Sequence, residues 1–220
     1  TLASKYNGGE YAFFEAQVVN DIDMTGKGYT NEGFSFYGTL NGLGHEIKGL
    51  TTPLFNLLYG SVKDVTITAN AVVSDVKEWD EINQYGAGLL SNYTYSGHEG
   101  QIIENVTVNG SLTIKDLTND GNHYRIGGIV GQTIIPIKNC TNNATITLDG
   151  YSTDKALSVG GIVGYIDQDD ADITGCHNTG SIVVKNSYAS GEFRAAGIVG
   201  YINKTADILN CTNNGAISVT

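Results

Sequence analysis

The sequence predicts an all-β protein, a right-handed parallel β-helix (solenoid) of about five coils with three strands per coil. Two internal repeats predict this fold: a glycine motif occurs three times, and a cysteine-centred segment recurs at a similar interval. The composition agrees, because 29 Gly, only 2 Pro and a charged fraction of 16 % favour a turn-rich β chain over a helical one.

The glycine motif reads IGGIVGQT from Ile126, VGGIVGYI from Val159 and AAGIVGYI from Ala195. Its glycine spacing is similar to that of a phosphate-binding loop. A dinucleotide fingerprint, however, occurs once, between a strand and a helix of a βαβ unit. Repetition at intervals of 33 and 36 residues is instead typical of a solenoid, in which each coil buries its apolar side by stacking on its neighbours.

The cysteine-centred segment is expected to supply further strands of each coil. Its copies are IPIKNCTNNATITLD (135–149), ADITGCHNTGSIVVK (171–185) and ADILNCTNNGAISVT (206–220), with weaker copies at 101–115 and 60–75. In the second half of each copy, apolar residues occupy every other position. This period of two predicts a strand with one buried face.

A corner is predicted directly before the cysteine column. An apolar residue precedes that column by three positions in each copy, and a spacing of three cannot keep both side chains on one face of a flat strand. The residue next to the column is of a type that best tolerates a positive φ. These corner residues are Asp64, Asn105, Asn139, Gly175 and Asn210.

The glycine motif is expected to form the remaining strand, with the isoleucine after the glycine pair facing inward. Gln132, Tyr165 and Tyr201 occupy one position of this motif, and Asn92 occupies it in a weaker copy, GAGLLSNY from Gly86. A position that accepts both Gln and Tyr is expected to face solvent. This outward column is a candidate ligand-binding strip, unless another segment of the chain covers it.

Two more columns are expected to be structural. The three cysteines are predicted to form a buried stack of free thiols, because an odd number excludes complete disulfide pairing and a free Cys packs as a small hydrophobe; they are Cys140, Cys176 and Cys211. Two residues further on, side-chain amides are expected to hydrogen-bond from coil to coil as a ladder; they belong to Asn142, Asn178 and Asn213.

The formal net charge of −11 argues against a nucleic-acid partner, because the chain has too few cations to replace the counterions of a polyanion. No apolar run approaches the roughly 18 to 20 residues that a membrane helix needs. The sequence closes on AISVT, inside a predicted strand. Because an uncovered strand is an open sheet edge, we expect either further residues in the natural protein or end-to-end self-association.

Two stretches precede the repeats, NDIDMTG from Asn20 and FYGTLNGLGHEIKGL from Phe36. With the glycine and cysteine motifs in this order, the chain resembles bacterial cell-surface proteins with GLUG-type repeats. It departs from their pattern at Asn41, where Asp is usual, and at Leu43, where Asn is usual. The resemblance implies a secreted or surface-anchored β-helix, of a kind found in gut Bacteroidetes and Firmicutes and beside some IgA-cleaving metallopeptidases.

The resemblance implies a scaffold or adhesive module and no known activity. We expect a single β-helix domain over residues 1–220, with 1–55 as the first coil or cap region and 56–220 as the repeat coils. We expect it to be part of a longer protein at the cell surface or outside the bacterial cell.

Catalysis is an alternative, because parallel β-helices include pectin lyases and polygalacturonases. A lyase needs a basic residue beside an acidic calcium cluster, and a hydrolase needs paired carboxylates. The two arginines, Arg125 and Arg194, stand just before glycine motifs, so we expect them on one side of the helix, two coils apart. His98 and His123 lie in the variable connections, where a functional role is a further hypothesis.

A calcium site is a second hypothesis, and no other cofactor is expected. The stretch DQDDAD places carboxylates at short spacings that suit a hard cation with oxygen ligands; they belong to Asp167, Asp169, Asp170 and Asp172. The other coils lack this cluster. The alternative is a solvated acidic turn.

These features together predict a non-catalytic extracellular β-helix module for cell adhesion or for binding carbohydrate or a host surface. The candidate ligand residues are the outward column with Arg125 and Arg194, and the expected partner is a glycan or a host-surface protein. The long connections at 74–85, 116–125 and 186–194 project beside this column. Two alternatives stay open: a polysaccharide-active enzyme on a β-helix, and a purely structural spacer.

Overall fold

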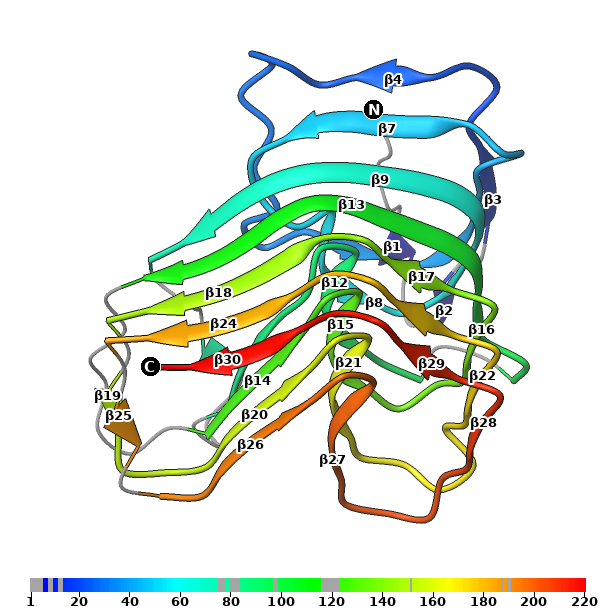
Figure 1. Ribbon diagram of the computed structural model, residues 1–220. Helices are drawn as coiled ribbons and strands as arrows, with labels where there is room; N and C mark the ends of the chain where they lie inside the picture. The colour runs from blue at the N-terminus through cyan, green and yellow to red at the C-terminus, as the bar shows by residue number, and fades with distance from the viewer. Residues whose placement is uncertain are drawn as a thin grey trace.

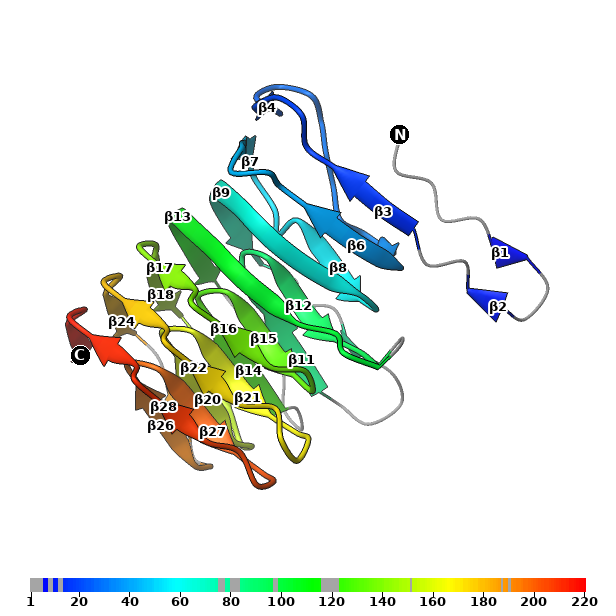
Figure 2. The same cartoon turned by 90° about the vertical axis from the view of Figure 1, so that its right-hand side faces the viewer.

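A computed structural model shows that the protein is a parallel β-helix, as the sequence predicts (Figure 1). It describes residues 6–7, 10–11, 14–74, 78–79, 84–96, 99–115, 123–150, 152–186, 188–189 and 191–220. Among these residues thirty strands are defined and no helix is found. The coils stack along one axis, with the N-terminal layers at one end and the C-terminal layers at the other (Figure 2).

One sheet of fifteen strands, the long sheet, forms one side of the stack. Its strands are β3 (Phe14–Gln17), β4 (Ile22–Asp23), β6 (Gly38–Asn41), β7 (Glu46–Leu50), β9 (Ser61–Val73), β13 (Ile103–Lys115), β16 (Ile137–Lys138), β17 (Thr141–Asn142), β18 (Thr145–Asp149), β22 (Ile173–Thr174), β23 (His177–Asn178), β24 (Ile182–Lys185), β28 (Ile208–Leu209), β29 (Thr212–Asn213) and β30 (Ile217–Val219).

Two further sheets meet at the glycine motif. The approach sheet leads the chain to the motif through β10 (Glu78–Trp79), β11 (Gln84–Ala87), β14 (His123–Gly127), β20 (Leu157–Gly160) and β26 (Phe193–Ala196). The return sheet leads it away through β5 (Ser35–Phe36), β8 (Phe55–Leu58), β12 (Ser91–Thr94), β15 (Val130–Thr133), β21 (Val163–Ile166) and β27 (Val199–Ile202). Two small pairs are β1 (Tyr6–Asn7) with β2 (Glu10–Tyr11), and β19 (Ser152–Thr153) with β25 (Tyr188–Ala189).

Each later coil visits the sheets in the same order. The chain runs along β13 in the long sheet, crosses to β14 in the approach sheet, turns at the glycine pair and returns through β15 to β16. The strands of successive coils pair in parallel, whereas β1–β2 and β10–β11 pair antiparallel. In the last coil, β26 rises to the glycine-motif turn and β27 descends from it. The long sheet arches over both strands (Figure 1).

The strand register confirms the columns that the repeats predict. Ile103 pairs with both Val62 and Ile137, so the residues three positions before the cysteine column stack on one another. Leu112 pairs with Ile146, which pairs with Ile182 in the next coil. These side chains are buried and alternate with partly exposed neighbours, which is the period of two that the sequence shows.

The predicted corner is confirmed at every copy. The residue before the cysteine column has a left-handed backbone, which Gly, Asn and Asp adopt at lower cost than other residues. The φ angles are 53° at Asp64, 54° at Asn105, 53° at Asn139, 64° at Gly175 and 54° at Asn210. The chain therefore bends in the same place in each of these layers.

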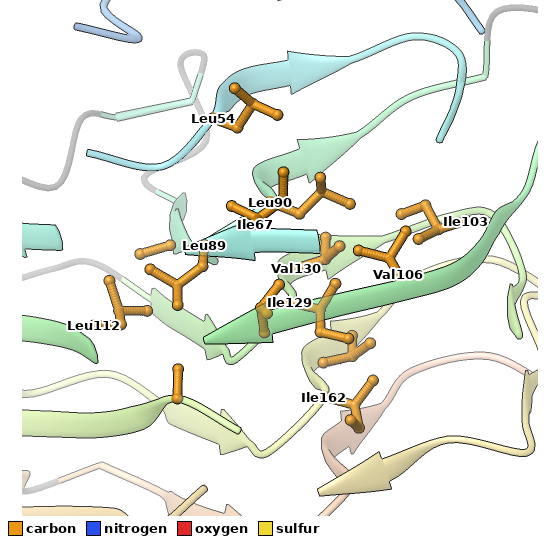
Figure 3. Packing of buried hydrophobic residues seen from close by; sticks show 14 of the residues in the cluster. Leu54, Ile67, Leu89, Leu90, Ile103, Val106, Leu112, Ile129, Val130 and Ile162 are labelled. Carbon is orange, nitrogen blue, oxygen red and sulfur yellow. The ribbon is translucent and has the colours of Figure 1, made fainter. Parts of the chain in front are cut away.

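The core fills the space between the long sheet and the two other sheets. Ile129 and Ile162, from the glycine motif, are fully buried and belong to the same cluster as Val106 and Leu112 of the long sheet (Figure 3). Cys140 and Cys176 are also fully buried and free, and burial raises the pKa of the Cys140 thiol. Cys211, in the last coil, is partly exposed.

Side-chain amides form a ladder behind the glycine corner, the turn between approach and return strands at Gly128, Gly161 and Gly197; Asn142 and Asn178 are buried, whereas Asn213 is exposed. Asn142 Nδ2 donates to Asn178 Oδ1 at 2.8 Å, and Asn178 Nδ2 donates to Asn213 Oδ1 at 2.7 Å. The second glycine of each pair lies against this ladder: a Cβ on Gly128 would be 2.5 Å from Asn142 Cγ, and one on Gly161 would be 2.5 Å from Asn178 Nδ2. A side chain at either glycine would therefore collide with the amide ladder, so the ladder requires glycine at this position.

The first layers are smaller than the later ones. The strands β3 and β4 pair with β6 and β7, which pair with β9, so residues 14–50 stack on the same long sheet. Among the described residues, the approach sheet begins only at β10 and β11, whereas the return sheet already contains β5 and β8. Within the described ranges, strands of these two sheets therefore follow one another only in the later coils.

The Asn142→Ala substitution is expected to destabilise the protein by about 2–3 kcal/mol, because buried partners of the amide lose their hydrogen bonds. These partners are the Ala144 backbone, whose N–H donates to Asn142 Oδ1 at 3.0 Å, and Asn178. The adjacent Asn143 is exposed, and Asn143→Ala should cost about 0.5 kcal/mol or less. The urea midpoints of the two variants test this, and equal midpoints would contradict it.

A second substitution tests the backbone of the N-terminal turn. Among the described residues with positive φ, Leu43 (φ 52°) is the only one that is not Gly, Asn or Asp, and its side chain is largely exposed. Leu43→Asn should stabilise the protein by about 0.5–1 kcal/mol, because Asn tolerates the left-handed region better. The urea midpoint should rise for Leu43→Asn and stay unchanged or fall for Leu43→Val.

Candidate binding groove

The glycine corner folds each coil inward, so the approach and return sheets form the two walls of a groove. At the corner the strands of the two sheets almost touch: a Cβ on Gly131 would be 2.6 Å from Ala87 N, and one on Gly164 would be 2.4 Å from Ile126 N. Only glycine permits this approach. Away from the corner the walls diverge around a groove of about 350 Å³, lined by Arg125, Ser158, Tyr165, Glu192, Arg194 and Tyr201, among others.

Four planar side chains form a stack along this groove, which we call the Arg–Tyr stack. The Arg125 guanidinium carbon is 3.6 Å from the ring centroid of Tyr165. The centroids of Tyr165 and Tyr201 are 5.3 Å apart, and the Arg194 guanidinium carbon is 4.1 Å from the centroid of Tyr201. Such cation–π contacts contribute about 0.5–2 kcal/mol each, so the stack orders side chains from three successive coils.

Arg125 is the buried end of the stack, with only 5 % of its surface exposed. One guanidinium nitrogen donates to Gln132 Oε1, and Gln132 Nε2 donates to Asp167 Oδ2 at 3.2 Å. The other carboxylate oxygen of Asp167 accepts from Asn203 Nδ2 at 2.8 Å. A chain of hydrogen bonds thus links the return strands of three coils.

The environment of the stack keeps its groups in their usual ionic forms. Burial lowers the pKa of the Arg125 guanidinium, and Tyr165 and Asp167 oppose that shift. Arginine nevertheless stays protonated in proteins. Burial raises the pKa of the Tyr165 phenol, against the effect of Arg125, so at neutral pH Tyr165 presents a neutral hydroxyl that can donate and accept.

Arg194 is the more accessible end of the stack, with 26 % of its side chain exposed. It forms an ion pair with Glu192, whose side chain is 72 % exposed, and its Nη1 lies 3.5 Å from Ser158 Oγ. Ser158 pairs with both Arg125 and Arg194 in the approach sheet. The two arginines therefore lie on one side of the helix, two coils apart.

The outward column predicted from the glycine motif needs two corrections. Gln132 is only 8 % exposed, because the Arg125 side chain of the opposite wall folds over it. Asn92 does not belong to the column, since Tyr93 is the residue that pairs with Gln132. The weaker copy is shifted by one residue, so that Ala87, rather than Gly86, pairs with Ile126.

The residues that do align are Tyr93, Gln132, Tyr165 and Tyr201. Tyr93 is buried, whereas Tyr165 and Tyr201 are half-buried at the groove. Asn92 instead donates from Nδ2 to Asn56 Oδ1 at 3.0 Å.

The four carboxylates of the predicted calcium site do not converge. Asp169 and Asp172 each accept a hydrogen bond of 2.8 Å from a backbone amide of the next coil. Asp167 belongs to the hydrogen-bond chain of the groove, and Asp170 lies in the turn with a φ of 62°. Within the described ranges, no group of three or more His, Cys, Asp or Glu side chains is arranged to hold a metal ion.

Sequence reasoning missed a second aromatic stack, on the return side of the first layers. The ring centroids of Tyr37 and Tyr59 are 4.5 Å apart, and those of Tyr59 and Tyr95 are 5.1 Å apart. Each of these tyrosines directly follows a strand of the return sheet. That shared position after β5, β8 and β12 is the signal that would have identified them. They do not line the groove.

The long connections beside the groove fall partly outside the described residues, at 75–77, 80–83, 116–122, 187 and 190. His98 also lies outside the described residues. His123 lines the groove on the approach side.

Part of the groove carries a known repeat. Residues 156–183 match the GLUG motif. The GLUG segment contains β20, the glycine corner and β21, and it continues into β24. It thus includes Ser158 and Tyr165 of the groove, together with Cys176 and Asn178 of the two buried ladders.

Comparison with solved structures gives a distant likeness. The chain is similar to a Bacteroides ovatus protein described as a candidate immunoglobulin A1 protease, at 18 % identity and a TM-score of 0.47; the match covers 99 % of this chain and 79 % of that one. No activity follows for this chain from that likeness. No curated protein matches the sequence. The described part of the chain contains no helix of the length and apolar character needed to span a bilayer.

The two arginines are expected to differ in their contribution to stability. Arg125→Lys should cost about 1–3 kcal/mol, because a buried ammonium cannot both donate to Gln132 and cover the Tyr165 ring. Arg194→Lys should cost less, about 0.5–1 kcal/mol, because its ion pair with Glu192 is exposed and the contact with the Tyr201 ring is only weakened. Urea unfolding of both variants tests this, and an equal loss of stability would show that burial does not separate the two positions.

Proposed function

We propose that the protein is a non-catalytic extracellular binding module and that its groove binds carbohydrate. The observation that carries this proposal is the Arg–Tyr stack, in which two arginines and two tyrosines line one groove. Planar polar groups of this kind match the hydroxyl groups of a sugar. A volume of about 350 Å³ lies at the lower end of the roughly 300–1,000 Å³ typical of small-molecule sites.

The stack favours binding because it is already ordered. The Tyr165 ring lies under Arg125 of the preceding coil, and its plane is tilted by 39° to that of Tyr201 of the following coil. Hydrogen bonds from Gln132 and Asn203 fix the neighbouring carboxylate of Asp167. Fewer side chains then lose freedom when a ligand binds, which lowers the entropic cost of association.

Binding is preferred to catalysis because Glu192, which lines the groove, and Asp167, which lies near Tyr165, are both engaged. Glu192 pairs with Arg194, and Asp167 accepts hydrogen bonds from Gln132 and Asn203. A glycoside hydrolase needs one carboxyl as general acid and a second as nucleophile or base. In this groove the two carboxylates instead position the cationic and amide side chains.

An extracellular location is part of the proposal. The match of residues 156–183 to the GLUG motif supports it, since the sequence resembles bacterial surface proteins with such repeats. A rigid stack of coils with a groove along its side suits attachment to glycans at a host surface. Adhesion is therefore the role that we propose for the module.

The double substitution Tyr165→Ala plus Tyr201→Ala should weaken glycan binding by about thirtyfold or more, because it removes the centre of the stack. The matched control is Tyr37→Ala plus Tyr59→Ala, which removes two stacked tyrosines outside the groove. A glycan array followed by calorimetry on the best ligand measures both. The urea midpoint of each variant confirms folding before binding is compared.

Three results would contradict the proposal. Undiminished binding by the Tyr165/Tyr201 variant would move the site away from the groove. Complete silence of the wild-type protein on the array would favour a structural spacer. Release of new reducing ends from a polysaccharide, lost on Glu192→Gln or Asp167→Asn, would favour an enzyme.

A further inference from the structure

The groove differs in charge from the rest of the protein. The chain has 23 acidic and 12 basic residues and a formal net charge of −11, yet both of its arginines line this one groove. Arg125 and Arg194 come from β14 and β26, two coils apart, and both lie against the tyrosine pair. The two guanidinium groups of this acidic protein therefore lie in the same groove.

We propose that the groove selects acidic sugars, with Arg194 binding the carboxylate of a uronate or sialate residue and the Arg–Tyr stack holding the ring. The inference rests on the proposed carbohydrate-binding function and names the ligand class for the same groove. A guanidinium group matches a carboxylate in a bidentate geometry, with two parallel N–H···O bonds. Neutral sugars offer no such partner.

His123 lines the same groove and lies near both arginines and Lys155. Burial lowers the pKa of His123, and Arg125, Lys155 and Arg194 lower it further, against the effect of Asp154. The positive charges of Arg125, Lys155 and Arg194 therefore all act on His123 at the approach wall. A negative group that enters the groove meets this field at close range.

Glu192 forms the same kind of ion pair with Arg194 that a ligand carboxylate would form. Its carboxylate pairs with the guanidinium, but its side chain is 72 % exposed, and an exposed ion pair contributes only about 1 kcal/mol or less. Inside the groove, the Tyr201 ring supports Arg194 at 4.1 Å and Ser158 Oγ lies 3.5 Å from its Nη1. A ligand carboxylate can therefore replace Glu192 on a guanidinium that stays in place.

The flanking charges limit the ligand to isolated negative groups. Glu192 lines the groove, Asp167 lies near Tyr165, and the net charge of −11 repels a dense polyanion. One carboxylate among neutral sugars meets Arg194 without this repulsion. We therefore expect a glycan with a single acidic residue to bind better than a uniformly sulfated chain.

The experiment compares acidic glycans with their neutral parents. The probes are arrayed sialosides, uronate-containing oligosaccharides and O-sulfated glycans, each printed beside the same glycan without its acid group. Methyl esters of the best carboxylated ligands remove the charge with little change of shape. Wild-type protein should bind the carboxylated member about tenfold or more above its neutral parent and its ester. The sulfated set distinguishes a carboxylate site from a general anion site.

Two variants place the selectivity at Arg194. Arg194→Gln should lose the preference for acid over neutral glycan by about tenfold or more, while the Tyr165/Tyr201 variant loses binding to both. Glu192→Gln should strengthen binding of the acidic ligand about threefold to fivefold, because it removes the competing carboxylate. Glu104→Gln is the matched control, since it removes a carboxylate paired with Lys138 on the long sheet.

The outcomes separate this inference from the proposed function. Equal binding of acidic and neutral glycans, lost in the Tyr165/Tyr201 variant, would overturn the acid selectivity and leave carbohydrate binding intact. Weaker binding in Glu192→Gln, or an equal gain in Glu104→Gln, would also overturn it. An absence of binding to every glycan would overturn the proposed function and this inference together.

Discussion

The close approach of backbones at the glycine corner is the constraint on which the rest of the structure depends. A side chain on Gly128 or Gly161 would meet the buried amide ladder, and one on Gly131 would meet the approach sheet. Without that approach the two sheets could not fold toward each other, and Arg125 could not reach Tyr165 across the groove. The same glycines thus fix the packing of the core on one side and the shape of the groove on the other.

The fold follows from local features of the sequence, whereas the groove does not. Period-two alternation placed Leu112 and Ile146 in one buried column, and residue type placed the positive φ at Asn105 and Asn139, because both depend on the local chain. The contact between Arg125 and Gln132 depends on how far one sheet folds toward another. Alternation assigns a side chain to a face but does not show what covers that face. The shift at Asn92 has a similar origin, since pairing with the neighbouring coil sets the register there.

The groove places a buried and a more exposed arginine in a single row of side chains. At its inner end, Arg125 is buried and bonded, so it holds neighbouring coils in place. At its outer end, Arg194 has the same chemistry but an exposed partner, so it can exchange that partner at little cost. Tyr165 contacts Arg125, Tyr201 contacts Arg194, and the two tyrosines contact each other. The two arginines therefore differ in exposure: the buried Arg125 supports the structure, whereas the more exposed Arg194 is the one that a ligand could contact.

The parallel register of the return sheet aligns one equivalent residue from each coil in a column, and the later members of that column line the groove. Each coil contributes one side chain at a fixed height, in the order Tyr93, Gln132, Tyr165 and Tyr201. Duplication or loss of a coil would lengthen or shorten this series by one unit without disturbing the corner or the amide ladder. Exchange of the single residue in a coil would change one subsite and leave the others unaltered. Evolution can thus change the wall formed by the return sheet one coil at a time while the rest of the scaffold stays unchanged.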